Sequence, residues 1–348
     1  MKKIFLCLVL ICLVLTGCGK KNEKTVLNEF KDKVMNSDSY YLSGNMEIVN
    51  NEDVYTYDVM VSYKKDDYYK IELTNVISNH KQIILRNNEG VYIVTPSLNK
   101  SFKFQSDWPY NNSQVYLLSS LLDDISSDEN RIFESKDNEY VFTSSVNYPN
   151  NSKLVNQKVY FGDDYLPRKV LVMDASGNTQ IKMEFDKIDL KTNFNDTYFD
   201  LNSILNTEDL EKDNENKNDS LTQEPNDDSK VSETATLDDV IYPMYLPVNT
   251  YLTNKEKVAT ENGERLILTF TGDKPFTLME ETVSYGSVAE IIPTYGDVEL
   301  IGNSLAVVNE NSVNWFDGGI EYYVVSDVMN TSELLDVVRS ISVLPVSK

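Results

Sequence analysis

The chain has 348 residues and carries 32 Lys and Arg against 55 Asp and Glu, so its formal net charge is −23 at pH 7. This length suggests two domains and allows an apolar core to be buried without disulfide bridges. The acidic balance argues against a nucleic-acid partner, because binding a polyanion requires clustered Lys and Arg.

The first residues have the pattern of a lipoprotein signal peptide. A cationic start at Lys2 and Lys3 precedes an uncharged apolar run, Ile4 to Leu15, and the chain continues through Thr16 and Gly17 to Cys18. The run is too short to cross a bilayer, which takes about 20 residues. The Leu-Thr-Gly-Cys string resembles a bacterial lipobox. We therefore predict a signal peptide at residues 1–17, a lipid on Cys18 and a lipid-anchored tether at 18–24; the alternative is an ordinary secretory signal.

Cleavage before Cys18 removes Cys7 and Cys12, so the mature protein keeps no thiol for a nucleophile, a disulfide or a zinc site. The single histidine, His80, lies between strand-like segments and is predicted to be an exposed loop residue. Serine-triad and two-histidine metal chemistry are disfavoured accordingly. We expect an extracytoplasmic protein anchored to the cell membrane, with no metal and no cofactor apart from the covalent lipid on Cys18.

Helix and strand periodicities alternate through residues 25–205. Apolar residues recur at helical spacing in 25–36 and again in 113–125, where Asn112 or Ser113 is expected to cap the helix. Val91–Val94 is apolar on both faces, so this part of the sheet must be covered on both sides, by helices or by a ligand. Antiparallel strands are predicted at 46–48, 55–63, 68–73, 82–86, 90–95, 101–104, 140–146, 157–161, 168–173 and 180–185.

The composition changes between residues 206 and 234, where ten acidic residues face three Lys and no aromatic residue occurs. Such a segment buries too little apolar surface to order its backbone, so it is predicted to be a disordered acidic linker. It separates a domain at 25–205 from a small α+β domain at 235–348. In the second domain a closing helix is expected at 332–341 behind a Thr331 or Ser332 cap, after strands at 264–271, 276–280, 297–301, 304–308, 312–316 and 320–326.

No catalytic constellation stands out. Adjacent carboxylates such as Asp123-Asp124 and Asp163-Asp164 are expected by chance among 55 acidic residues, and neighbouring side chains point apart on a helix or strand. The glycine-containing turns fit neither a nucleophile elbow nor a phosphate-binding loop. The chain is predicted not to be an enzyme.

Aromatic residues concentrate between Asn99 and Leu122. The simpler interpretation is a core strand followed by a loop and a helix. The alternative is a recognition patch, since a Trp in an irregular loop is hard to bury, and Trp and Tyr dominate binding hot spots. The candidate contact residues for a partner or a ligand are Phe102, Phe104, Trp108, Pro109 and Tyr110.

At these residues the chain resembles a known family. The lipobox, the first helix, Ser39–Ile48, Gln82–Leu121 and Tyr198–Leu201 together are similar to LolA-like lipoproteins of endospore-forming bacteria related to the germination lipoprotein GerS. The C-terminal part resembles a small domain of unknown function. The resemblance implies a mainly β, α+β fold: a LolA-like curved antiparallel half-barrel with covering helices, an acidic linker, and a small C-terminal α+β domain.

The resemblance also implies a function. The leading hypothesis is a membrane-anchored, non-enzymatic lipoprotein that binds a protein partner, such as a cortex amidase, in cell-envelope or spore-cortex remodelling. One alternative is a lipid or lipoprotein carrier with an acyl chain in the concave face. Another is an RseB-like envelope sensor. An exposed edge strand would allow a homodimer.

Overall fold

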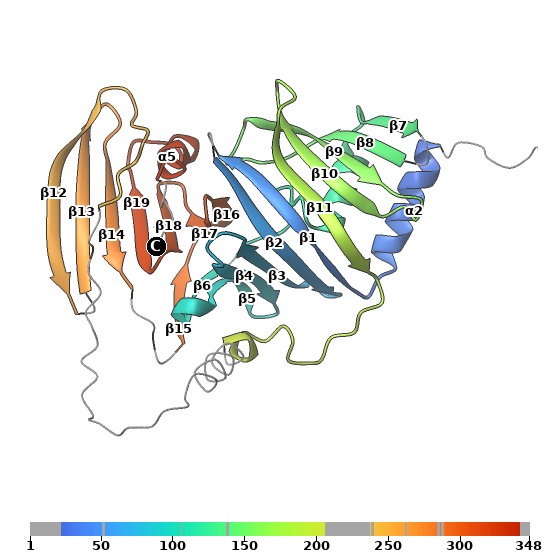
Figure 1. Ribbon diagram of the computed structural model, residues 1–348, viewed down its shortest axis with the longest axis horizontal. Coiled ribbons are helices and arrows are strands. Elements are labelled where there is room, and N and C mark those ends of the chain that lie inside the picture. Colours follow the sequence, from blue (N-terminus) through green and yellow to red (C-terminus); the bar gives the residue numbers. More distant parts are fainter. Residues whose placement is uncertain are drawn as a thin grey trace, which may run out of the picture.

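The computed structural model describes residues 22–50, 53–104, 106–136, 139–205, 237, 240–261, 263–283, 286 and 289–341. The signal peptide, Cys18 and the acidic linker predicted at 206–234 lie outside the described residues. The described part is built from two mainly antiparallel sheets with few helices (Figure 1), so the predicted mainly β fold class is confirmed.

In the larger sheet, strand β1 lies in the interior: the strands that follow it in sequence extend the sheet on one side, and β11 to β7 extend it on the other. The order of the sheet is β15-β6-β5-β4-β3-β2-β1-β11-β10-β9-β8-β7, and only the β15–β6 pair is parallel. The strands of the N-terminal half are β1 (Ser39–Asn50), β2 (Asp53–Lys64), β3 (Tyr68–Asn75), β4 (Lys81–Asn87), β5 (Gly90–Thr95), β6 (Lys100–Phe104), β7 (Ile132–Lys136), β8 (Glu139–Ser145), β9 (Leu154–Phe161), β10 (Pro167–Asp174) and β11 (Thr179–Asp189).

One face of this sheet packs on helices α2 (Glu23–Met35) and α3 (Leu118–Ser127). Helix α2 buries Val26, Phe30 and Val34, and the Phe30 ring meets Phe161 of β9 edge to face at 4.9 Å. A bulge between Ser43 and Gly44 bends β1 against β11. A Cβ at Gly44 would lie 2.0 Å from the Glu184 carbonyl oxygen, so the close approach of the two strands requires glycine here.

The opposite face of β4 and β5 is also covered, as the apolar run Val91–Val94 predicted. Tyr92 and Val94 pack there against Phe199 and Leu201 from the segment that follows β11. The cover is therefore supplied by this chain.

The smaller sheet has the order β12-β13-β14-β19-β18-β17-β16. Helix α5 (Thr331–Val338) packs on it through Leu334, Leu335, Val337 and Val338. The strands of the C-terminal half are β12 (Thr250–Thr260), β13 (Gly263–Gly272), β14 (Phe276–Thr282), β15 (Glu290–Thr294), β16 (Asp297–Ile301), β17 (Ser304–Val308), β18 (Ser312–Asp317) and β19 (Ile320–Val325).

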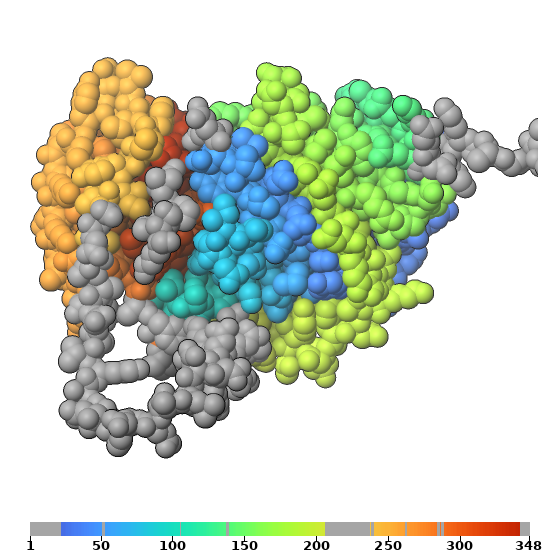
Figure 2. All heavy atoms as spheres, in the orientation of Figure 1, coloured from blue at the N-terminus to red at the C-terminus, as the bar shows by residue number. Residues whose placement is uncertain are grey.

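The two halves share one core. Strand β15 adds to the edge of the larger sheet beside β6, and Val298, Leu305, Val307 and Phe316 of β16–β18 belong to the same buried cluster as helices α2 and α3. The Phe316 ring stacks on Phe102 of β6 at 4.9 Å between centroids. In the space-filling view the red part of the C-terminal half lies beside the blue N-terminal strands (Figure 2).

Several local predictions were wrong. Helix α3 begins at Leu118, five residues later than expected, because the residues before it form turns and the Ser113 hydroxyl bonds Asp124 instead of capping. Helix α5 is capped by Asn330, whose side chain accepts from the Glu333 N–H in a capping box. Strands β7, β12 and β15 were not predicted. All residues of β12 from Tyr251 to Ala259 are exposed, so no apolar alternation marks it.

The shared core predicts a coupling between the halves. Phe316→Ala should lower the free energy of unfolding by about 3 kcal/mol, because a ring that is 1% exposed leaves a cavity. Phe102→Ala should have a similar effect, and the double variant should lose about 1 kcal/mol less than the sum, since the rings stack on each other. Urea denaturation measures all three. Tyr295→Ala, at a side chain that is 81% exposed, is the control. Strictly additive effects of the two Phe substitutions would contradict the shared core.

Candidate functional site

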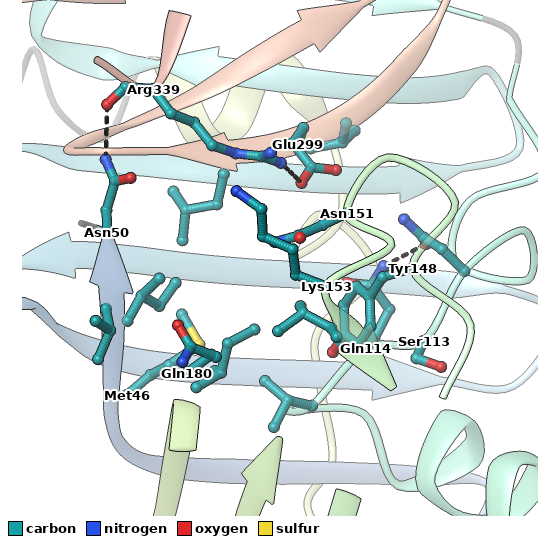
Figure 3. A pocket seen from close by; sticks show the side chains of 18 of the residues that line it. Met46, Asn50, Ser113, Gln114, Tyr148, Asn151, Lys153, Gln180, Glu299 and Arg339 are labelled. Carbon is teal, nitrogen blue, oxygen red and sulfur yellow. Dashed lines mark hydrogen bonds and ion pairs between the residues drawn. The ribbon is translucent and has the colours of Figure 1, made fainter. Parts of the chain in front are cut away.

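A cavity of about 300 Å³ lies where the concave face of the larger sheet meets the C-terminal half (Figure 3). Strands β1 and β11 contribute from the sheet, and two loops contribute from the β6–α3 and β8–β9 connections. Strands β16 and β17 and the end of α5 close the cavity from the C-terminal side. Its lining residues are Met46, Ile48, Val49, Asn50, Trp108, Asn112, Ser113, Gln114, Val115, Tyr116, Tyr148, Asn151, Lys153, Leu154, Gln180, Ile181, Val298, Glu299, Leu300, Gly302, Leu305, Asp336 and Arg339.

The lining combines two kinds of surface. Aliphatic side chains come from the strands, among them Met46, Ile48 and Ile181. Amide, hydroxyl and charged side chains come mostly from the two loops and from the C-terminal half. A cavity of this mixed lining suits a ligand that has both apolar and hydrogen-bonding groups.

An ion pair joins β16 to the end of α5 at the cavity wall. The Arg339 guanidinium donates to Glu299 at 3.0 Å, and both side chains are largely buried. Burial raises the pKa of Glu299, and the charge of Arg339 acts in the opposite direction. The Asn50 amide of β1 donates to the Arg339 carbonyl oxygen at 2.9 Å, which ties this corner to the larger sheet (Figure 3).

Asp124 of α3 holds the two loops that line the cavity. Its carboxylate accepts from the Ser113 hydroxyl at 3.0 Å and from the Gln157 amide at 3.0 Å. The Ser113 hydroxyl also accepts from the Asn147 N–H at 2.8 Å, so the loops before α3 and after β8 meet at this side chain. Burial raises the pKa of Asp124 from 3.8 to about 6, although both hydrogen bonds lower it.

One polar group of the lining, the indole N–H of Trp108, has no hydrogen-bond partner among the described residues. The Trp108 side chain is 1% exposed, so its N–H is a buried donor. Buried donors without a partner are uncommon in folded proteins.

The structure places the predicted contact residues mostly in the core. Phe102, Phe104 and Trp108 are 2%, 2% and 1% exposed, and Pro109 is buried. The argument that Trp108 is hard to bury was wrong, because its ring packs edge to face on Tyr69 while the C-terminal half covers Phe102. Trp108 lines the cavity, and Tyr110 alone of the five is exposed.

The loop that carries Trp108 is itself bound by the C-terminal half. Asp297 of β16 accepts from the Ser106 hydroxyl at 3.0 Å and from the Asn111 amide at 2.6 Å. These bonds flank Trp108 on both sides in sequence. The stretch predicted as a recognition patch therefore recognises another part of the same chain.

His80 was predicted to be exposed, and it is only partly so. It lies in the turn between β3 and β4, and burial lowers its pKa from 6.5. Its Nε2 atom is buried without a partner among the described residues. Within that part of the chain no group of three or more His, Cys, Asp and Glu side chains could hold a metal ion. No helix there is both long enough and apolar enough to span a membrane.

Two comparisons with known sequences show the family to which the chain belongs. Residues 1–199 match the model of the family described as sporulation protein YdcC-like. The chain is also 32% identical over 334 residues to the sporulation protein YdcC of Bacillus subtilis (strain 168), which covers 95% of this chain and 94% of that protein.

Solved structures show more distant likenesses. A chain of the Pseudomonas aeruginosa MucA/MucB complex covers 90% of this chain and 96% of its own length, at 13% identity and a TM-score of 0.32. A chain of the Clostridioides difficile CwlD amidase complex with the GerS lipoprotein covers 52% of this chain and 100% of its own length, at 15% identity and a TM-score of 0.30. A putative outer membrane lipoprotein-sorting protein domain from Vibrio parahaemolyticus covers 52% of this chain and 97% of its own length, at 13% identity and a TM-score of 0.33. Likenesses this distant support no inference about function.

Together the fold and the cavity define a mainly β protein in which two sheets enclose a small site of mixed polarity. The family match covers more than half of the chain, and the similarity to the Bacillus subtilis protein spans nearly all of it. The chain belongs to the YdcC-like family of sporulation proteins.

The raised pKa of Asp124 predicts a pH dependence of stability. A carboxyl group with a higher pKa in the folded state than in the unfolded state binds its proton more tightly when folded. Its contribution to stability therefore falls as the pH rises from about 4 to about 6, and stays low above that. Asp124→Asn should raise the free energy of unfolding by about 1–2 kcal/mol at pH 7.5 and leave it unchanged at pH 4.

Urea titrations of both proteins across this pH range measure the difference. Asp186→Asn, at an exposed carboxylate of β11, is the matched control and should give no change at either pH. A gain for Asp124→Asn that does not depend on pH would contradict the assignment.

Proposed function

We propose that this protein is a lipid-anchored, non-catalytic sporulation lipoprotein that binds a protein partner at the cell envelope. Membership of the YdcC-like family of sporulation proteins supports a role in sporulation. The Leu-Thr-Gly-Cys string supports an extracytoplasmic position, with the lipid on Cys18. The tether from Cys18 to the first described helix is short, which would keep α2 close to the membrane.

The observation that carries partner binding is an exposed apolar segment in the C-terminal half. We name Tyr242, Met244, Tyr245, Leu246, Val248 and Tyr251 the C-terminal apolar patch. Met244 is 84% exposed, Val248 80% and Tyr251 63%, although Ile241, just before Tyr242, packs against the core of the smaller sheet. Consecutive large apolar side chains that remain in solvent mark a protein interaction site.

We therefore propose the C-terminal apolar patch as the partner contact, in place of the aromatic stretch around Trp108. That stretch is buried beneath β15 and β18, whereas the C-terminal apolar patch is open. By its resemblance to GerS-type lipoproteins, the partner would be an envelope enzyme such as a cortex amidase. A deletion strain whose cortex keeps a normal content of muramic-δ-lactam would argue against an amidase partner and leave the patch proposal intact.

The lipid anchor has a direct test. Cys18→Ala should abolish incorporation of a palmitate analogue into the protein, because the lipobox Cys is the predicted lipid acceptor. Cys12→Ala, within the predicted signal peptide, is the matched control and should keep the incorporation. Palmitate incorporation that survives Cys18→Ala would contradict the proposal.

The partner contact is tested by cross-linking and mass spectrometry in sporulating cells. The unaltered chain should cross-link to an envelope protein, and purified samples of the two should then associate. Met244→Asp with Val248→Asp should weaken this association at least tenfold. The control pair is Val76→Asp with Ile77→Asp, which places the same charges on exposed apolar residues of the β3–β4 turn and should have little effect. Equal losses in both pairs, or no envelope protein captured, would contradict the proposal.

A further inference from the structure

A buried carboxyl group of the smaller sheet contacts the segment that carries most of the C-terminal apolar patch. Glu280 of β14 is 0% exposed, and its Oε1 atom has no hydrogen-bond partner among the described residues. Its neighbour in register on β19 is Tyr322, whose hydroxyl is likewise buried without a partner in that part of the chain. Two such groups side by side in one sheet are unusual, because an unpaired buried polar group costs free energy.

The segment that contacts Glu280 is held on the sheet at few points. Residues 240–248, which we name the strap, form neither helix nor strand, so no ladder of backbone hydrogen bonds fixes them. At one end the Ile241 N–H donates to Glu280 Oε2 at 3.4 Å. Farther along, the Met244 N–H donates to the Ser340 carbonyl oxygen, after α5, at 3.1 Å. Because Glu280 is one of these few anchors, its charge should affect how firmly the strap is held.

The other groups around Glu280 do little to neutralise its charge. Lys255 of β12 is the cation that acts on it, but the Lys255 ammonium also donates to the Tyr242 hydroxyl at 3.2 Å. Tyr322 of β19 offers a neutral hydroxyl, Leu266 is the register neighbour on β13, and α5 packs on this sheet through apolar side chains. Burial raises the pKa of Glu280 from 4.5 to about 7, whereas the hydrogen bond from the strap and the charge of Lys255 lower it.

We propose that Glu280 is a proton-dependent latch for the strap: the neutral carboxyl group holds the strap on the sheet, and ionisation loosens it. An ionised carboxylate that is buried with a single hydrogen bond gains solvation when the strap moves away and water enters, and a neutral carboxyl group gains far less.

The latch would regulate the partner contact. The strap includes Tyr242 to Val248 of the C-terminal apolar patch, so a firmly held strap presents these side chains in one arrangement. A partner that binds a loosened strap must also order it, which weakens the association. This inference rests on the proposed function only in taking the patch as the partner contact.

The direction of the pH dependence follows from proton linkage. The pKa of Glu280 is higher with the strap in place than with the strap displaced, because water then reaches the carboxyl group. The closed strap is therefore most stable below about pH 4.5, loses stability as the pH rises to about 7, and stays less stable above that.

Hydrogen–deuterium exchange of the strap amides tests the latch, on the chain from residue 18 with Cys18→Ala. After correction for the intrinsic pH dependence of exchange, the protection of the Ile241 amide should fall by about tenfold or more between pH 5 and pH 8. Glu280→Gln keeps a neutral side chain of similar shape, so its protection should fall by less than about twofold. Glu281→Gln, the next carboxylate along β14 and on the opposite face, is the matched control and should behave like the unaltered protein.

A second pair of variants keeps Glu280 itself. Lys255→Met removes the charge that favours the ionised carboxylate, so the loss of protection should move to higher pH. Tyr242→Phe removes the hydroxyl that Lys255 contacts and keeps the charge, so it should leave the pH range unchanged. If Glu280→Gln does not fold, this comparison decides alone.

The proposal is overturned if the protection of the strap does not change with pH, or if Glu280→Gln loses it as the unaltered protein does. It is also overturned if protection falls equally at Leu278 in the centre of β14, because the whole sheet would then be opening. The exchange experiment needs no partner, so a failure of the latch leaves the proposed function standing, and a failure of patch binding leaves the latch standing.

Discussion

The architecture depends on the insertion of the β16–β17 hairpin into the concave face of the larger sheet. Val298 and Leu305 of this hairpin are buried with helices α2 and α3, and β15 continues the same sheet beyond β6. Polar bonds fix the depth of insertion at the hairpin turn: the Tyr57 hydroxyl donates to the Gly302 carbonyl oxygen, and the Asn75 amide donates to Asn303 at 3.0 Å. Because apolar burial and specific hydrogen bonds coincide there, the two halves have a defined relative position.

The cavity is a consequence of this insertion. The hairpin fills much of the concave face, and the space that remains is bounded by strands on one side and by two loops on another. Asp124 of the N-terminal half bonds Ser113 of the loop before α3. Asp297 of the C-terminal half bonds Ser106 and Asn111 of the same loop across the junction. A site built at the meeting of two sheets takes its apolar part from strands and its polar part from loops, and this division explains the mixed lining.

Much of the fold could be predicted from the sequence, because strands and helices that bury only one face have apolar residues at regular spacing. The meander from β1 to β6 and the strands from β8 to β11 follow their alternation closely. The prediction failed where periodicity carries no information. Strand β12 is exposed from Tyr251 to Ala259, and β15 contains Pro293 and is held at a sheet edge by a tertiary pairing. The burial of Trp108 also depends on tertiary packing, since residues almost 200 positions later help to cover its loop.

The site could be predicted only in part, for the same reason. Trp108 was identified by its residue type, but the argument for it assumed an exposed loop. Asn50, Asn151, Glu299 and Arg339 have no sequence motif that relates them, and they line one cavity only after the hairpin is in place. The acidic composition likewise gave no indication that Arg339 and Glu299 form a buried pair between β16 and α5.

The burial of the aromatic stretch also changes where a partner can approach. In an open half-barrel the concave face and the free edge of β6 would be available, but here the hairpin and β15 occupy both. Exposed apolar surface is found instead on the segment that leads into β12. Figure 1 shows β12 and α2 at opposite ends of the long axis, so an anchor next to α2 would point β12 away from the membrane. With such an anchor, a partner at the C-terminal apolar patch would be met on the side that faces away from the lipid, while the cavity between the halves stays free for a small ligand.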